Sequence, residues 1–313
     1  MPGDVNDVPS RSSLDRVGGT SRSKHSVHAG WSVLLERVCD AVVIQIGVGC
    51  TFEFVTTRDT HAVVMVEPHL SEAGRVTETR FEISPAAPSH VYLDHFGNSC
   101  RRVTLAEGPV TLSFDAELSA VDDPEPADHL ALEVAAEDLS DATLLFVLPS
   151  RFCESDQMAD FAFQQFGRVS PGWSRVQAVC DWVHESVRFE YGMSSPSYSA
   201  VDVLGSRVGV CRDFTHLAIT LCRALTIPAR YVFGYLPDIG VEDPGTPMDF
   251  CAWMEVYLGD EWHTFDPRNN ERRIGRTVIG RGRDAADVAM VTSFGMIELR
   301  EMTVRAAEKS PPS

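Results

Sequence analysis

The sequence predicts an α+β protein: an N-terminal antiparallel β-sandwich, followed by helices packed on an antiparallel sheet. Two observations predict this order. Between Gln45 and about Leu118, apolar and polar residues alternate with a period of two, and turn-forming residues separate the alternating segments. After Ser170 the apolar residues follow helical spacing, and strand-like segments return from Ala229 onward. A period of two is typical of half-buried strands, and helical spacing is typical of amphipathic helices.

Composition supports a folded chain and excludes several classes of protein. Of the 313 residues, 44% are hydrophobic and 23% are charged, which provides enough apolar material for sizeable cores. The chain has 27 basic and 45 acidic residues, a net charge of −18 that would repel nucleic acid and anionic membranes. No apolar run reaches the roughly 18 residues that a transmembrane helix needs. We therefore expect neither nucleic acid nor a membrane as partner.

Cysteine usage and the N-terminal residues favour a cytoplasmic location. The eight cysteines are scattered, without a Cys-x-x-Cys pair, which is typical of reduced thiols inside the cell. Residues 1–30 are rich in Ser, Asp, Arg and Gly and contain no apolar segment. This composition predicts a disordered extension and not a secretory signal.

The strand-like half begins after that extension. The clearest alternating segments are Thr51–Val55, Val76–Phe81 and Val110–Phe114, and Thr143–Leu148 is predicted to be one more strand. Turn formers such as Gly97-Asn98 and Gly108-Pro109 separate them. Together these patterns predict a disordered extension at 1–40, a β-sandwich domain at 41–150, a second domain at 151–295 and a C-terminal tail at 296–313.

Two helices are predicted next. Ser170-Pro171 is a helix start signal, because it combines a capping hydroxyl with proline at the first helical position. Helical spacing of apolar residues continues from Val176 to Val187. A second helix is predicted from Cys211 to Leu225 and is apolar on nearly every face, which indicates that it is buried.

Strands are then predicted at Ala229–Leu236, Ala252–Leu258 and Glu261–Asp266, the last two joined by a two-residue turn, Gly259-Asp260. In such a hairpin Leu258 faces Glu261, and Val256 faces His263. The same register places four residues on one face of the sheet, namely Cys251, Trp253, Glu255 and Asp266. His263 then lies on the opposite face.

Cys211 is the first candidate for chemistry. Its predicted position is the first turn of a buried helix, where unpaired backbone N–H groups and the helix dipole favour a thiolate. The same N–H groups could hold the oxyanion that forms when a carbonyl is attacked. The alternative is that Cys211 is a small buried residue like the other cysteines.

Residues Ser174 to about Asn270 resemble the transglutaminase-like core, a branch of the papain-like cysteine peptidase architecture. The β-rich half is similar to the N-terminal domain that accompanies this core in bacterial proteins. The matching motifs, in order, are Gly209-Val-Cys-Arg-Asp213, Arg223-Ala-Leu-Thr-Ile-Pro-Ala-Arg230, Ala252-Trp-Met-Glu-Val-Tyr257 and Trp262-His-Thr-Phe-Asp-Pro267. The resemblance implies a papain-like fold for the second domain and a Cys–His–Asp triad.

Carried over to this chain, the resemblance makes Cys211 the nucleophile and Asp266 the carboxylate that orients the base. It places the histidine immediately before Ala252, where this sequence has Cys251. A thiol does not replace an imidazole as a base near neutral pH. Removing the base from a triad costs on the order of 10⁶ in turnover.

Three other histidines are candidates for the missing base. The hairpin register turns His263 away from Asp266. His216 follows Cys211 by about 140° around the helix, and is more typical of a hydrogen-bonded core histidine. His184 lies on an amphipathic helix and is expected at the surface. None is a convincing replacement.

Four residues are candidates for binding substrate. Tyr191 and Trp253 are predicted to line the cleft, although aromatic residues here are equally typical of a core. Arg281 and Arg283 lie in a segment, Arg272–Met290, that could fold over the cleft and offer arginines to an acidic or carbonyl substrate. The alternative for this segment is a solvated charged loop.

The leading hypothesis is therefore a transglutaminase-like cysteine acyltransferase or amide hydrolase that forms a thioester on Cys211. Its substrate would be a peptide or protein amide, or a small-molecule amide, and no cofactor is expected. One alternative is a catalytically inactive binding or scaffold protein of the same fold. A second is a redox-sensitive Cys211–Cys251 pair. A metal site formed by both thiolates, Asp266 and a histidine lacks any ligand-pair spacing, so we expect no metal.

Overall fold

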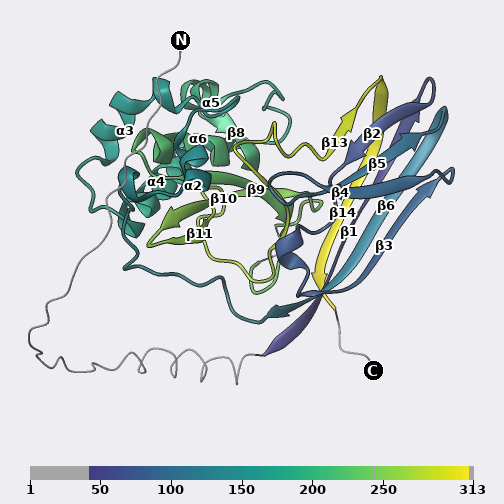
Figure 1. Cartoon of the computed structure of the whole chain (residues 1–313), viewed down its shortest axis with the longest axis horizontal. Helices are drawn as coiled ribbons and strands as arrows, with labels where there is room; N and C mark the ends of the chain where they lie inside the picture. Colours follow the sequence, from purple (N-terminus) through teal and green to yellow (C-terminus); the bar gives the residue numbers. More distant parts are fainter. Residues whose placement is uncertain (1–41, 243, 310–313) are drawn as a thin grey trace, which may run out of the picture. The chain divides into compact units, whose positions relative to one another are not determined.

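The β-rich part of the chain forms two four-stranded antiparallel sheets, seen on the right of Figure 1. The computed structural model describes residues 42–242 and 244–309, so the disordered extension predicted at 1–40 lies outside the described residues. One sheet has the order β14-β1-β6-β3, and the other has the order β13-β2-β5-β4. The strands are β1 Val43–Thr56, β2 Thr60–Val64, β3 Val76–Ser84, β4 Ser89–Leu93, β5 Ser99–Leu105, β6 Gly108–Val121, β13 Val291–Ser293 and β14 Ile297–Glu308.

Alternation explains why these segments are strands. In β1, Ile46, Val48, Cys50, Phe52 and Phe54 are buried, and most of the residues between them are more exposed. The same alternation runs along β6, so the two long strands turn one apolar face inward. Burial of that face stabilises the sheet, because apolar surface leaves water.

The prediction of a C-terminal tail at 296–313 is wrong for most of its length. Ile297–Glu308 forms β14, which pairs antiparallel with β1 from Thr56↔Ile297 to Ile46↔Glu308. The strand follows from its sequence, since Met302, Val304 and Ala306 alternate with charged and polar residues. The sandwich is therefore completed by a segment that follows the helical part of the chain.

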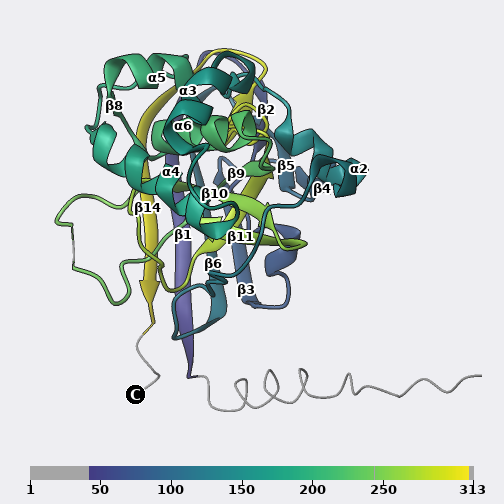
Figure 2. The same cartoon turned by 90° about the vertical axis from the view of Figure 1, so that its left-hand side faces the viewer.

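The α-helices form a layer that lies in front of a third four-stranded sheet in Figure 2. The α-helices are α2 Asp141–Leu144, α3 Ala159–Phe166, α4 Trp173–Ser186, α5 Ala200–Ser206 and α6 Cys211–Ala224. Short 3₁₀ helices occupy Leu70–Glu72, Ala136–Asp138, Leu145–Val147 and Ser155–Gln157, and β7 Arg188–Phe189 pairs with β8 Val208–Gly209. The predicted helix from Cys211 is confirmed, and its central residues are buried.

Two local predictions differ from the structure. The strand expected at Thr143–Leu148 is wrong: the segment is helical, because the Ser140 hydroxyl accepts the Thr143 N–H and begins α2. The helix predicted to start at Ser170-Pro171 begins at Trp173, and the residue before it is Gly172 with φ 96°. A Cβ at position 172 would lie 2.3 Å from the Ala131 carbonyl oxygen, so the residue that precedes α4 must be glycine.

The third sheet has the order β11-β10-β9-β12. It is formed by β9 Ala229–Tyr235, β10 Cys251–Leu258, β11 Glu261–Phe265 and β12 Thr277–Gly282. The predicted hairpin register is confirmed, with Leu258 opposite Glu261 and Val256 opposite His263. Gly259 and Asp260 both have positive φ, as a two-residue hairpin turn requires.

Helix α6 packs against β9 and β10, which brings the start of the helix next to the start of β10. Most of the buried apolar residues of the sandwich and of the helical part belong to one cluster, and Val232, Trp253 and Val278 form a second. The predicted domain boundary near residue 150 stays a prediction. In the part of the chain that the structure describes, no helix is long and apolar enough to cross a membrane.

Candidate active site

The start of α6 is fixed by its own side chains. Asp213 accepts the Val210 N–H at 2.8 Å and is fully buried. A Cβ on Gly209 would lie 2.6 Å from the Asp213 Cβ, which explains the glycine two residues before the cysteine. Arg212 pairs with Asp213 and donates to the Ser195 carbonyl at 2.7 Å. These contacts hold Cys211 at the first residue of the helix.

The sulfur of Cys211 is surrounded by hydrogen-bond donors. As a thiolate, Cys211 can accept from the Cys251 thiol and from the Ala252 N–H. When protonated, the Cys211 thiol donates to the Phe250 carbonyl oxygen at 3.8 Å, and the Cys251 thiol lies 3.7 Å from the Ala252 carbonyl oxygen. The Cys251 hydrogen bond is the largest effect on the pKa of Cys211. Together with the Ala252 N–H and the Arg268 guanidinium, it lowers that pKa, although burial and Asp249 oppose the shift. Cys211 is thereby predisposed to react as a thiolate.

Other cysteines have the opposite shift. Burial raises the pKa of Cys222, at the far end of the same helix, to about 12. It also raises the pKa of Cys153 to about 12 and that of Cys50 to about 11. All described cysteines are free thiols. Among them Cys211 alone has a lowered pKa, because it alone combines a helix start with donors directed at its sulfur.

Cys251 lies at the start of β10, at the position where the resemblance leads us to expect a histidine. Its pKa is raised well above the ordinary value, chiefly because the thiol proton is held in the hydrogen bond to Cys211, with burial and nearby negative charge adding to the effect. Cys251 therefore acts as the donor and Cys211 as the acceptor. We call these two residues the sulfur pair.

Asp266 follows β11 and is nearly fully buried. Its carboxylate accepts hydrogen bonds from the backbone N–H groups of Arg268 and Asn269, from Asn269 Nδ2 and, at 2.7 Å, from Arg276 Nη2. Burial alone would raise the pKa of Asp266, but Arg276 and Asn269 outweigh it and lower that pKa. We call Asp266, Asn269 and Arg276 the carboxylate cluster.

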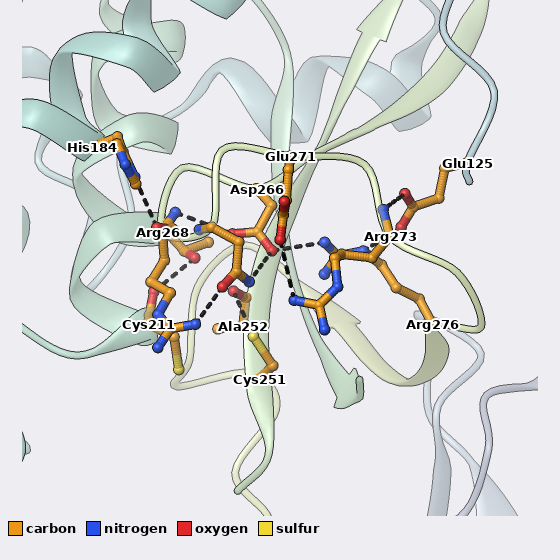
Figure 3. A network of polar contacts seen from close by, with 12 residues as sticks. Glu125, His184, Cys211, Cys251, Ala252, Asp266, Arg268, Glu271, Arg273 and Arg276 are labelled. Carbon is orange, nitrogen blue, oxygen red and sulfur yellow. Dashed lines mark hydrogen bonds and ion pairs between the residues drawn. The ribbon is translucent and has the colours of Figure 1, made fainter. Parts of the chain in front are cut away.

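Figure 3 shows the sulfur pair on one side of this network and Arg276 with Glu125 on the other. Arg276 also pairs with Glu125, and its guanidinium lies 4.8 Å from the centre of the Trp253 ring. Asp266 is close enough to Cys251 to influence its pKa. The hydrogen bonds to the carboxylate within the described residues, however, come from its own loop and from Arg276.

Each of the three candidate histidines is hydrogen-bonded to a backbone group and not to Cys211. His184 Nδ1 lies 2.8 Å from the Arg268 carbonyl oxygen, and His263 Nε2 lies 3.1 Å from that of Leu258. His216 is fully buried, and its Nε2 accepts the Ala285 N–H. Burial, together with Arg212 and Arg223, lowers the pKa of His216 well below its ordinary value, so this imidazole is neutral.

Two cavities meet at the sulfur pair. The first, which we call the polar cavity, has a volume of about 150 Å³. Its lining beside Cys211 and Cys251 is mixed: the charged residues Asp238, Asp249, Arg268 and Arg273 lie with Tyr191 and with apolar side chains such as Leu236, Met248 and Phe250. The second, the apolar cavity, measures about 490 Å³. Its walls are mainly aromatic and aliphatic side chains from β1, β9, β14 and the segment 285–291.

The structure places Tyr191 as predicted: it is 54% exposed and lines the polar cavity. The prediction for Trp253 is wrong, because this residue is 1% exposed, packs with Val232 and Val278 and lines neither cavity. The predictions for Arg281 and Arg283 are also wrong.

Arg281 lies in β12 and pairs with Glu255 at 2.8 Å, and Arg283 pairs with Asp287 at 2.8 Å. Neither lines a cavity that contains Cys211. The arginines that do so are Arg212, Arg268 and Arg273. Arg273 belongs to the predicted segment 272–290, so the expectation of an arginine from this segment selected the right region and the wrong residues.

No group of three or more metal-ligating side chains occurs among the described residues. The site itself supplies a thiol of lowered pKa, a second thiol beside it, and the backbone N–H groups at the start of a helix.

Comparison with known proteins agrees with this arrangement. The family model of the transglutaminase-like superfamily matches residues 159–267, which include Cys211, Cys251 and Asp266. Residues 159–267 therefore match this superfamily, and the fold is that of the papain-like cysteine enzymes.

A solved structure from Cytophaga hutchinsonii, described as a "putative cysteine protease", superposes with a TM-score of 0.76 at 28% identity, over 87% of this chain and 93% of that one. An uncharacterized protein of Mycobacterium leprae is 24% identical over 230 residues, 71% of this chain and 81% of its own length. An uncharacterized protein of Mycobacterium tuberculosis is 31% identical over 147 residues, 43% of this chain and 46% of its own length. These relatives are bacterial.

Proposed function

We propose that the protein is a cysteine enzyme that transfers or hydrolyses acyl groups through a thioester on Cys211. The observation that carries the proposal is the state of this one sulfur atom. Its pKa is lowered while buried cysteines elsewhere in the fold have raised values, and it lies in the wall of two cavities. A nucleophile needs both properties, ionisation and access.

In the proposed reaction the Cys211 thiolate attacks the carbonyl carbon of an acyl substrate. The backbone N–H groups at the start of α6 stabilise the oxyanion. The carbon–sulfur bond forms, the bond to the leaving group breaks, and the acyl group remains as a thioester. Water or an amine then attacks the thioester and regenerates the thiolate.

Cys251 determines which leaving groups depart easily. Its thiol is the side chain that donates to Cys211, so it is placed to give a proton to a departing nitrogen. Its raised pKa makes it a poor acid for that step. We therefore expect slow turnover of amides and faster turnover of activated esters and thioesters, whose leaving groups depart without a proton.

A direct test incubates the reduced protein with p-nitrophenyl acetate and locates the acetyl group by intact and peptide mass spectrometry. We expect one acetyl group on Cys211, no adduct in Cys211→Ala and an unchanged adduct in Cys222→Ala. Equal labelling of Cys211→Ala and the unmodified protein would favour an inactive binding protein of this fold.

The sulfur pair also supports a second candidate, a redox function. Hydrogen peroxide would oxidise the Cys211 thiolate to a sulfenic acid. The Cys251 thiol would then attack that sulfur, form a disulfide and release water, so that the two thiols supply the two electrons that reduce the peroxide. The observation that favours it is the hydrogen bond between the two sulfurs. Peptide mapping after peroxide treatment should find a reducible 211–251 crosslink, and its absence would remove this candidate.

A further inference from the structure

The two cavities beside Cys211 differ in chemistry, and this difference defines a substrate class. We infer that the substrate has an apolar acyl group, aliphatic or aromatic, that occupies the apolar cavity, and a polar leaving group that occupies the polar cavity. The inference rests on the proposed thioester on Cys211 and adds to it the identity of the acyl group.

The apolar cavity is formed where the sandwich meets the third sheet, which contains β9 and β10. Phe54 of β1 and Ile297 and Met302 of β14 supply one wall, while Phe233 of β9 and Val288 supply another. Arg212 and Asp249 contribute polar atoms next to the sulfur pair. A cavity of about 490 Å³ with such walls is of the size and character that binds small organic ligands.

The polar cavity combines charged groups with apolar side chains, so its lining is more polar than that of the apolar cavity. Arg273 pairs with Asp238 at 2.7 Å, and Arg268 lies over the Phe189 ring at 4.4 Å from its centre. Asp249 accepts the Phe250 N–H at 2.7 Å. These charged groups stabilise water and polar ligands, while Leu236, Met248 and Phe250 are among the apolar side chains that line the rest of this smaller cavity.

The direction of binding follows from the second half of the reaction. After the leaving group departs, the acyl group is bonded to the sulfur, and water or an amine must reach the thioester carbon. Polar acceptors are stabilised on the polar side, so the acyl chain belongs on the apolar side. There it also loses contact with water, which favours binding in proportion to the apolar area buried.

The segment that completes the sandwich then contributes to specificity. Leu299 and Met302 both line the apolar cavity, and Leu299 is 50% exposed at its rim. Because Leu299 is half-exposed, a charged residue at position 299 can be accommodated by the fold. A glutamate at this position would place a negative charge at the rim of the apolar cavity, where the acyl chain would enter it from water.

The experiment measures acylation of Cys211 by p-nitrophenyl acetate, butyrate and hexanoate as kcat/KM, with the adduct located by mass. Each added methylene should raise kcat/KM by about fourfold if it is fully buried. The variant Leu299→Glu should lower the hexanoate-to-acetate ratio by about tenfold or more. Phe294→Glu is the matched control. Phe294 is 70% exposed and lies outside the cavity, so the hexanoate-to-acetate ratio of this variant should equal that of the unmodified protein.

Failure of the two proposals can be told apart. If Cys211 is acylated but the rate is flat or falls with chain length, the acyl-group inference is wrong and the proposed function stands. If no ester acylates Cys211, the proposed function is wrong. The cavity is then tested without acyl transfer, by alkylation of Cys211 with N-methyl-, N-propyl- and N-hexylmaleimide. A rate that rises along this series supports an apolar ligand site, and a flat series overturns it.

Discussion

The sulfur pair and the carboxylate cluster lie close together and differ in almost every property that matters for chemistry. Cys211 and Cys251 line two cavities, and their mutual hydrogen bond moves their pKa values apart. Asp266 is buried, holds a lowered pKa and is neutralised by Arg276. Reactivity is therefore concentrated at the sulfurs, while the carboxylate cluster has the partners of a structural ion pair.

The residue at position 251 determines whether these two regions work together. A histidine there could donate to a carboxylate with one ring nitrogen and contact the nucleophile with the other. A thiol has one proton, and the Cys251 thiol can give it either to the Cys211 thiolate or to the Ala252 carbonyl oxygen, 3.7 Å away, but not to both Cys211 and a carboxylate at once. In this site the nucleophile therefore has a lowered pKa while the carboxylate is paired with an arginine.

The largest effect should come from the carboxylate cluster and should concern stability. Asp266→Asn breaks a buried ion pair, and we expect it to lower the free energy of unfolding by about 3–5 kcal/mol in urea titrations. The matched control is Glu298→Gln, which breaks an exposed pair with Arg300 and should cost less than about 1 kcal/mol. Equal costs for the two variants would contradict the assignment of Asp266 to a buried structural pair.

Cys251→His should reconnect the two regions. An imidazole beside Cys211 can protonate a departing amine, so hydrolysis of an acyl p-nitroanilide should rise by about 100-fold, a fraction of what a triad base supplies. The pH profile should acquire a limb near the histidine pKa of about 6.5. A folded Cys251→His protein with unchanged hydrolysis would show that the carboxylate held by Arg276 cannot support a base at this position.

Removing the donor within the sulfur pair should have a smaller effect. Cys251→Ala deletes the hydrogen bond that contributes most to the lowered pKa of Cys211, so alkylation of Cys211 at about pH 7 should slow by about tenfold. Cys251→Ser retains a donor and should stay within about threefold of the unmodified protein. Equal rates in both variants would show that the Cys251 proton does not activate Cys211.

The smallest effect concerns His216, which is buried, neutral and outside the proposed reaction. Its pKa is lowered in the folded state, so its stabilising contribution is present above the unfolded value of about 6.5 and is lost as pH falls below it. Stability should fall by up to about 1.4 kcal/mol per pH unit in that range because of this group.

Replacement of His216 by Gln should remove that part of the slope, whereas His61→Gln, at an exposed position, should leave it intact. The measurement is the free energy of unfolding between about pH 4.5 and 7.5, below and above the pKa of an ordinary histidine. Parallel curves for His216→Gln and the unmodified protein would mean that His216 is not neutral in the fold.

Local patterns predicted the parts of the site that depend on short stretches of chain. The Gly259-Asp260 turn fixes the hairpin register, and the register placed Cys251 and Trp253 on one face, as the structure has them. The start of α6 at Cys211 was likewise readable, because Gly209 and Asp213 lie on either side of it.

The same local patterns could not show which residues from distant segments pack against a given face of the sheet. Trp253 was predicted to line the cleft, but its ring is buried against Val232 and Val278, with the Arg276 guanidinium 4.8 Å from its centre. The partner of Asp266 is Arg276, whose position depends on the fold of the intervening loop. The apolar cavity needs β14, a strand that alternation at Met302, Val304 and Ala306 could have indicated.

The most direct test of the central claim is the pH dependence of alkylation by iodoacetamide, followed separately for Cys211 and Cys222 by peptide mass. The two thiols belong to one helix and differ in what surrounds them. We predict that Cys211 reaches half its maximal rate below the free-thiol pKa of about 8.5, while Cys222 stays unreactive as long as the protein is folded. A Cys211 that titrates above that value, or reacts no faster than Cys222, would contradict the account.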